Sequence, residues 1–391
     1  MRIAYVSADR GVPIFGQKGC SIHVQEVLRA LVRRGAQVDL FSSRCEGAPP
    51  DGLETVLLHP LPCPAEAEPA AREQASLAAN ELLRADLERT GPFDLIYERY
   101  SLWSFSAMEF ARDAGLPGLL EVNAPLIEEQ AQYRVLVDRS AAERAADRVF
   151  GAARFLLAVS DEVAEYASGF PSAHGKVRVM PNGVNPERFP ENIEPSLPAP
   201  EGIFTVGFLG TLKAWHGLSF LMEAFAQFHG RYPNSRCLII GDGPERDSLD
   251  LQIAALGLPG TVHFTGAVPA QKVPGLLASM DVAVAPYPQL SRFYFSPLKV
   301  YEYMAAGRAV VASRIGQLEK LFETEVNGLL VPPGDSSALV VSFERLLSDA
   351  DLRSRMGCAA RATVLRKHTW DSVAERILSL AGIRNLDAIA Y

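Results

Sequence analysis

Short apolar runs rich in β-branched residues alternate with longer helical patterns along almost the whole chain. Such alternation is typical of βαβ units stacked around parallel sheets. In the first half, strands are predicted over residues 2–7, 37–41, 55–59, 94–97, 118–122, 155–160 and 176–180. Helices are predicted between most of these strands, including residues 21–35, 65–90 and 125–153.

A proline-rich segment interrupts this pattern. Pro190, Pro195, Pro198 and Pro200 lie within eleven residues, and no periodic pattern crosses them. The alternation then resumes, with strands predicted at 204–210, 237–240, 262–265, 282–285, 309–312 and 328–331, and helical segments from 336 to 381.

The break divides the chain into two α/β halves. A chain of 391 residues with 48% hydrophobic content can form two cores. The sequence therefore predicts two Rossmann-like domains that face each other across an interdomain cleft. They are expected at residues 1–190 and 203–368, joined by a linker at 191–202, with a final helix at 369–391 packing back on the first domain.

Composition narrows the function further. A net charge of −8 argues against nucleic acid as a partner. The five cysteines form no CxxC pair and the seven histidines no HxH or HxxxH pair, so no metal site is predicted. The N-terminus becomes charged too early for a signal peptide, and no apolar run approaches the ~20 residues of a membrane span. The sequence thus predicts a cytoplasmic protein without stable membrane insertion.

Two glycine-containing loops each join a predicted strand to a predicted helix. In the loop at 11–19, Gly16 and Gly19 would let the backbone approach a phosphate at a helix N-terminus. The loop at 210–217 adds Lys213 and His216, which would cradle an anion. An ordinary surface turn, with Lys213 merely solvated, is the alternative at either place.

Two further segments extend this pattern. The turn at Gly241 ends a strand and opens a helix. At residues 292–307, Pro297 suits a helix start, which would leave the amides of Phe295 and Ser296 near an open helix end. Lys299 and Glu302 would share a helix face, as a surface ion pair or at the edge of a half-buried site.

Together these segments resemble retaining glycosyltransferases of the GT-B fold, specifically family four. The resemblance covers nearly the whole chain. Besides the four loops, it includes the strings at 158–160, 180–185, 262–266, 304–307 and 327–332, and Trp370 in the final helix.

The resemblance implies a donor site in the second domain. Glu302 matches the second glutamate of the family's signature, which hydrogen-bonds the donor ribose, whereas the first glutamate falls on Tyr294. The family's diphosphate-binding Arg and Lys fall on Thr211 and His216, and its histidine near the donor sugar falls on Asn123. Because these residues differ from the family's, we expect Lys213 and Lys299 to supply the missing charge.

The resemblance therefore assigns individual residues to the expected donor site. Lys213, Lys299 and Asn123 are predicted to be catalytic, the lysines by stabilising charge on the leaving diphosphate. The predicted nucleotide-sugar-binding residues are Gly16, Gly19, Thr211, His216, Gly241, Val268, Tyr294, Phe295, Ser296 and Glu302. No cofactor is expected; the co-substrate would be a UDP-sugar or a GDP-sugar.

The acceptor is expected in the first domain. Tyr97, Glu98 and Tyr100 follow a predicted strand, so they are predicted to lie on a loop in the cleft and to bind a small-molecule, saccharide or lipid-linked acceptor. A charged turn packed on the next helix is the alternative.

Two other functions fit the same architecture. A nucleotide-sugar epimerase would need acid and base groups, for which Glu98 and Glu121 are the candidates. A non-catalytic nucleotide-sugar-binding protein would keep Glu302 without turnover.

Overall fold

The computed structural model describes residues 1–63 and 68–383. By its internal contacts the chain divides into two compact units. The first comprises the described residues up to Asn182, Tyr294–Ser296 and residues 370–383; the second comprises Gly183–Phe293 and Pro297–Thr369. The last part of the predicted final helix, 384–391, lies outside the described residues. The segment predicted as a linker, 191–202, lies within the second unit, and the first unit ends at Asn182, before the predicted boundary at 190.

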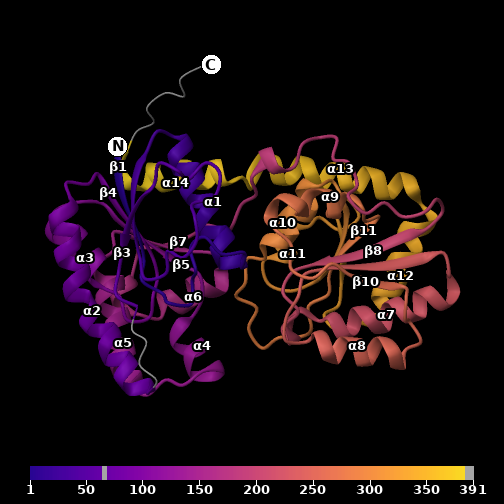
Figure 1. The fold of residues 1–391 in the computed structure, drawn as a ribbon, viewed down its shortest axis with the longest axis horizontal. Helices are drawn as coiled ribbons and strands as arrows, with labels where there is room; N and C mark the ends of the chain where they lie inside the picture. Colours follow the sequence, from indigo (N-terminus) through magenta and orange to yellow (C-terminus); the bar gives the residue numbers. More distant parts are fainter. Residues whose placement is uncertain (64–67, 384–391) are drawn as a thin grey trace. The chain divides into compact units, whose positions relative to one another are not determined.

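The first unit is built on a seven-stranded parallel sheet in the order β3-β2-β1-β4-β5-β6-β7. Helices lie on both sides of it (Figure 1). Its strands are β1 (Arg2–Ser7), β2 (Gln37–Ser42), β3 (Leu57–Pro60), β4 (Leu95–Arg99), β5 (Gly118–Val122), β6 (Phe155–Ala158) and β7 (Val177–Val179). Its helices are α1 (Gly19–Arg33), α2 (Pro69–Thr90), α3 (Ser106–Asp113), α4 (Leu126–Tyr133), α5 (Arg139–Ala152), α6 (Asp161–Ser168) and α14 (Trp370–Ala381).

The second unit has a six-stranded parallel sheet in the order β10-β9-β8-β11-β12-β13. Its strands are β8 (Phe204–Leu209), β9 (Ser235–Ile240), β10 (Val262–Phe264), β11 (Val282–Ala285), β12 (Ala309–Ser313) and β13 (Leu329–Val331). Its helices are α7 (Leu218–Arg231), α8 (Arg246–Ala255), α9 (Val273–Ala278), α10 (Leu298–Ala305), α11 (Leu318–Leu321), α12 (Ser336–Ser348) and α13 (Ala350–Lys367). Each unit has its own hydrophobic core.

Helix α14 belongs to the first unit although it follows the second along the chain. It packs on α1, where Arg33 and Arg34 pair with Asp371 and Glu375 at 2.9 and 3.3 Å. Trp370 at its start is buried and meets the edge of the His23 ring. None of the helices in the described part of the chain combines the length and apolar character that a membrane span requires.

One predicted helix is wrong. Residues 125–153 form α4 and α5, with residues 134–138 between them. Glu73 of α2 accepts the backbone N–H groups of Val137 and Asp138, both at 2.9 Å, and the Asp138 side chain caps α5 by accepting the Ala141 N–H. In a continuous helix these N–H groups would donate to backbone carbonyl oxygens. Here a carboxylate from a distant helix accepts them instead, and the helix is interrupted.

Both sheets reverse their strand order beside their first strand. The reversal falls between β1 and β4 in the first unit and between β8 and β11 in the second. In open parallel sheets, such a reversal separates the loops at the carboxyl ends of the two strands and leaves room for a ligand. Each unit therefore has one preferred place for a site.

Candidate active site

In the second unit, the loops at this reversal lie close together. Gly217 has a φ of 71°, and a side chain at this position would overlap the Pro286 carbonyl oxygen after β11. Gly210, at the end of β8, has a φ of 141°. A Cβ atom at Gly210 would lie 2.7 Å from the Nζ atom of Lys299. Glycine at both positions therefore permits the close approach of the two loops and of this amine.

Lys299 is in the first turn of α10, and its side chain is buried among aromatic rings. Its Nζ atom lies 4.0 Å from the ring centre of Phe208 and 5.7 Å from that of Tyr287. The amine is buried and has no hydrogen-bond partner among residues 1–63 and 68–383. Burial lowers the pKa of Lys299 well below its ordinary value. An amine in this state gains from any ligand that brings an anionic oxygen to it.

A short 3₁₀ turn, Ala214–His216, follows β8; Lys213 precedes it and His216 is its last residue. Lys213 is half-buried, with its Nζ atom 5.2 Å from the Trp215 ring centre. His216 Nδ1 lies 2.6 Å from the carbonyl oxygen of Thr211, which can only accept, so Nδ1 carries the proton. The Thr211 side chain itself is exposed.

The His216 ring is neutral. Burial, reinforced by the Lys299 charge, lowers the pKa of His216 to about 3. With Nδ1 protonated, the neutral ring presents Nε2 as a hydrogen-bond acceptor. This residue is therefore not a cation that could replace the family's lysine.

Glu302 follows Lys299 by three residues, but the two do not form the surface ion pair considered above. Glu302 pairs with Arg188, whose Nη1 lies 2.9 Å from its Oε1, and the two side chains are 15% and 17% exposed. Arg188 is also bound to the carbonyl oxygen of Ala270 through Nη2, at 2.9 Å. The sequence did not point to Arg188, because 114 residues separate it from Glu302.

Two other predicted donor contacts lie on this unit. A Cβ atom at Gly241 would overlap the Gly210 carbonyl oxygen, so this glycine permits the ends of β8 and β9 to approach each other. Val268 is half-buried in the loop after β10. The backbone around the strand-order reversal is thus shaped by three glycines, Gly210, Gly217 and Gly241. The buried amine of Lys299 lies beside Gly210.

Tyr294, Phe295 and Ser296 belong to the first unit by their contacts. The Ser296 hydroxyl and carbonyl oxygens accept from the backbone and side-chain nitrogens of Asn182, at 3.1 and 2.7 Å. Tyr294 contacts Glu129, with a distance of 3.5 Å between the hydroxyl and Oε2. The loop predicted to bind the donor is therefore divided between the two units.

Around β5, the first unit contains a buried network that the sequence did not predict. Both oxygens of Glu121 accept hydrogen bonds: Oε2 from Tyr97 at 2.5 Å, and Oε1 from Asn123 and Arg99 at 2.6 and 3.0 Å. His23 Nε2 lies 2.9 Å from Oε2. Burial alone would raise the pKa of Glu121, but His23, Arg99 and Tyr97 outweigh it and hold this pKa well below its usual value. Glu121 is thus ionised at neutral pH, and it holds the Asn123 amide.

The glycines of the first loop lie at the start of α1. Gly19 is exposed and is the first residue of the helix, with open space where a side chain would be. Gly16 is half-buried, and its carbonyl oxygen accepts from the Gln25 side chain at 2.9 Å.

The predicted acceptor loop is wrong. Tyr97 and Glu98 lie within β4, and both, together with Tyr100, are at most 3% exposed. Glu98 accepts from the Ser104 hydroxyl at 2.5 Å, and burial raises its pKa to about 7 despite that bond. Burial removes all three side chains from contact with an acceptor. Neither Glu98 nor the ion-paired Glu121 has the access that the epimerase alternative requires.

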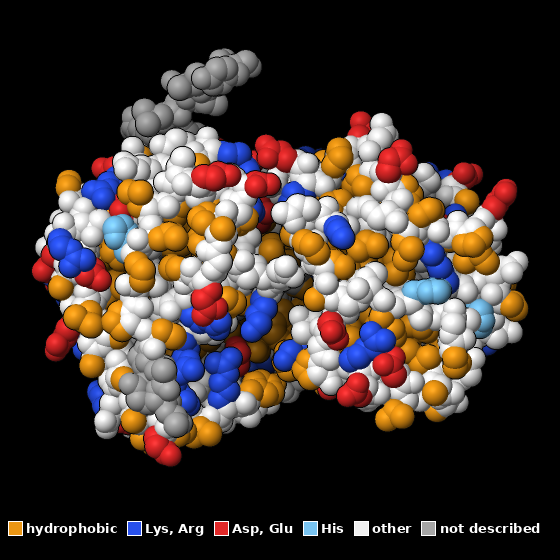
Figure 2. All heavy atoms as spheres, in the orientation of Figure 1, with side chains coloured by type: hydrophobic (Ala, Val, Ile, Leu, Met, Phe, Trp, Pro, Cys, Tyr) orange, Lys and Arg blue, Asp and Glu red, His pale blue; other side chains and the backbone are white. Residues whose placement is uncertain are grey.

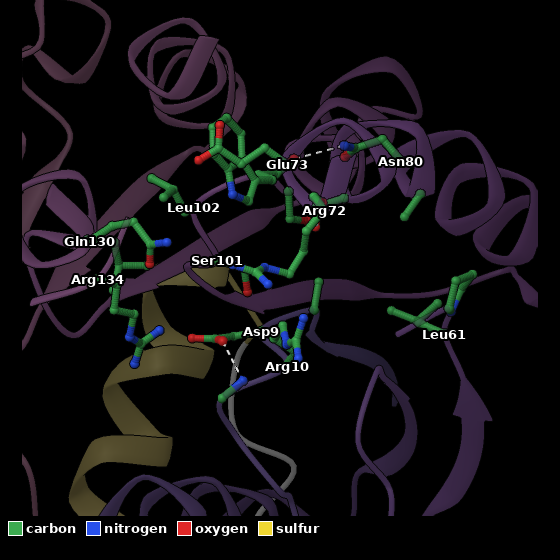
Figure 3. A pocket seen from close by; sticks show the side chains of 18 of the residues that line it. Asp9, Arg10, Leu61, Arg72, Glu73, Asn80, Ser101, Leu102, Gln130 and Arg134 are labelled. Carbon is green, nitrogen blue, oxygen red and sulfur yellow. Dashed lines mark hydrogen bonds between the residues drawn. The ribbon is translucent and has the colours of Figure 1, made fainter. Parts of the chain in front are cut away.

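The first unit instead has a large cavity at its own strand-order reversal. Its volume is about 580 Å³, and it is lined by residues after β1 and β4 and by α2 and α4. Basic side chains gather around α4 (Figure 2). Figure 3 shows Arg10, Arg72 and Arg134 entering the cavity beside Asp9 and Ser101. None of these residues carries a recognisable sequence motif.

Comparison with known proteins agrees with this architecture. Residues 18–188 match the family model Glycosyltransferase Family 4, and residues 203–349 match Glycosyl transferases group 1. The fold matches a structure of HepE from Anabaena in complex with UDP-glucose, with a TM-score of 0.72, 19% identity, and coverage of 98% of this chain and 99% of that one. The chain thus has the GT-B fold and belongs to the group 1, family 4 glycosyltransferases.

Two relatives illustrate the range of similarity. The chain is 30% identical to an uncharacterized glycosyltransferase of Methanocaldococcus jannaschii over 55% of its own length, a match that spans little more than half (56%) of that relative. It is 25% identical to the D-inositol 3-phosphate glycosyltransferase of Corynebacterium urealyticum, over 93% of this chain and 90% of the relative.

Proposed function

We propose that this protein transfers a sugar from a nucleoside diphosphate to an acceptor hydroxyl, with retention at the anomeric carbon and without a metal. The observation that carries the proposal is the buried Lys299 amine, which has no hydrogen-bond partner in the described part of the chain. A diphosphate oxygen would satisfy it. The UDP-glucose held by the Anabaena protein of the same fold supports a nucleotide-sugar donor.

The reaction needs charge stabilisation more than proton transfer. The bond from the anomeric carbon to the diphosphate oxygen breaks, and the acceptor oxygen bonds to the same face. The acceptor proton passes to an oxygen of the departing diphosphate, so no protein base is required. Lys299, assisted by Lys213, stabilises the negative charge that develops on the leaving group.

The remaining groups position the donor. Arg188 orients Glu302, whose carboxylate accepts the ribose hydroxyls. Neutral His216 accepts a hydrogen bond through Nε2 from a hydroxyl or a water molecule. Asn123, held by Glu121, contacts the donor sugar.

The test combines binding with product analysis. UDP, GDP, ADP and dTDP are screened for stabilisation of the full chain, because a ligand that binds only the folded state raises its melting temperature. The matching nucleotide sugars are then assayed for donor hydrolysis and transfer, and the anomeric configuration of the product is read by NMR. Epimerised donor, or binding without any turnover, would favour one of the two alternatives.

Glu302→Ala is expected to weaken nucleotide binding ten-fold or more. The change removes charge-assisted hydrogen bonds worth about 1.5–3 kcal/mol each. Calorimetry with the preferred nucleoside diphosphate measures the effect. Glu319→Ala, on α11 of the same unit, is the control and should bind normally. Equal affinity in the wild type and Glu302→Ala would contradict the ribose assignment.

Activity is expected to survive an excess of EDTA. The described part of the chain groups no three His, Cys, Asp or Glu side chains that could hold a metal ion, and the proposed charge stabilisation uses lysines. Initial transfer rates are compared after dialysis against chelator, with and without added Mg²⁺ or Mn²⁺. Loss of activity that either metal restores would reject a metal-independent reaction.

A further inference from the structure

The cavity of the first unit lies where an open parallel sheet binds ligands. It is lined by Ala8–Gly11 after β1 and by Ser101–Ser104 after β4, the two strands between which the strand order reverses. At about 580 Å³ it falls within the range of small-molecule sites. The position and size of this cavity are therefore those of a binding site for a small molecule.

Three arginines from separate segments line this cavity. Arg10 follows β1, Arg72 belongs to α2, and Arg134 directly follows α4. Figure 3 shows their side chains entering the cavity from different sides. A guanidinium group has only donors, and its planar fork matches the oxygens of phosphates and carboxylates. Three such groups around one cavity indicate an anionic ligand.

Three carboxylates line the same cavity, and their environments differ. Both oxygens of Glu73 accept backbone N–H groups of Val137 and Asp138. Asp9 accepts the Gly11 N–H at 2.7 Å. Burial raises the pKa of Glu129, the charge of Arg134 opposes this shift, and the charge of Asp9 adds to it. Glu73 is thus committed to the backbone, while Asp9 and Glu129 form an acceptor-rich side that suits hydroxyl groups.

We propose that this cavity binds the acceptor of the reaction and that the acceptor is a small polyhydroxylated phosphate monoester. Arg10, Arg72 and Arg134 hold the phosphate, and Asp9 and Glu129 accept hydrogen bonds from hydroxyl groups. A phosphate dianion matches three guanidinium groups better than a carboxylate, which carries a single charge. The assignment to an acceptor rests on the proposed transferase function.

The experiment measures binding to the full chain by calorimetry, without nucleotide and at constant ionic strength. The probes are two matched pairs, glucose 6-phosphate with glucose and myo-inositol 1-phosphate with myo-inositol, and glucuronate tests a carboxylate. At least one phosphate ester is expected to bind ten-fold or more tightly than its neutral partner. Arg72→Gln and Arg134→Gln should each lower that ratio at least three-fold, and Arg72→Lys should lower it less.

Arg89→Gln is the matched control, because Arg89 lies on the same helix as Arg72 with its side chain 73% exposed. It should keep the full ratio, and melting temperatures confirm that every variant is folded. Equal binding of esters and neutral partners, no measurable binding of either ester at millimolar concentration, or an unchanged ratio in the arginine variants would overturn the proposal. Glucuronate binding as tightly as glucose 6-phosphate would overturn the phosphate assignment.

Donor hydrolysis and nucleotide binding are measured in parallel and separate the two proposals. Nucleotide-sugar turnover without a preference for phosphate esters would reject this inference and leave the transferase standing. Phosphate-ester binding without nucleotide binding would reject the transferase, and with it the assignment of the cavity to an acceptor.

Discussion

Replacing Lys299 by methionine is expected to lower kcat by about two to three orders of magnitude, as the loss of one preorganised charge donor does in other enzymes. The donor KM should change much less, because ground-state binding is shared with Glu302. Transfer rates at saturating donor measure the effect.

The same variant should melt at a higher temperature than the wild type. The Lys299 amine is buried with no hydrogen-bond partner among the described residues, and its lowered pKa shows that folding disfavours its charged form. Methionine has a similar length and avoids this cost. Lys213→Met, at a half-buried position over Trp215, should show no such stabilisation. Normal turnover in Lys299→Met would reduce Lys299 to a structural residue and remove the main support for the proposed function.

Replacing Glu121 by glutamine is expected to destabilise the protein by about 3–5 kcal/mol, the usual cost of removing one partner from a buried ion pair. His23 and Arg99 would lose their shared anion, and the amide would keep only part of the hydrogen bonding. Urea unfolding at pH 7 measures the change. A loss below about 1 kcal/mol would show that the network contributes little to stability.

Glu98→Gln is the matched comparison for Glu121→Gln, since Glu98 lies on the neighbouring strand and is also buried, but the opposite effect on stability is expected. Its pKa is raised to about 7 in the folded protein, above the ordinary value of 4.5. Folding therefore disfavours the ionised carboxylate, and Glu98 costs stability as pH rises from about 4.5 through 7. Relative to the wild type, Glu98→Gln should gain stability across this interval. A constant difference between the two proteins would contradict the raised pKa.

Much of the fold could be predicted from the sequence. Every predicted strand is present within two residues at each end, because buried parallel strands are continuous apolar runs bounded by polar turns. The family resemblance is also confirmed. The local hydrophobic pattern was sufficient to predict the strands, and the order of the short sequence motifs was sufficient to predict the family.

The errors share one cause. Glu98 carries a polar group directly after the predicted strand 94–97, so the pattern places it in a loop, yet it is a strand residue. The Tyr97 hydroxyl reaches Glu121 and the Glu98 carboxylate reaches Ser104. Buried polar groups are tolerated where a partner meets them, and those partners come from other segments of the chain.

The sequence by itself determined the parallel α/β class, the positions of the strands, the family and the glycine-bearing loops, because these depend on local periodicity and on short ordered strings. Tertiary structure decided the state of the side chains in those loops. It made His216 a neutral acceptor, left the Lys299 amine without a partner, paired Arg188 with Glu302, and placed Arg72 and Arg134 around one cavity. Charge, burial and pairing depend on neighbours brought together from distant parts of the chain, and spacing along the sequence does not encode them.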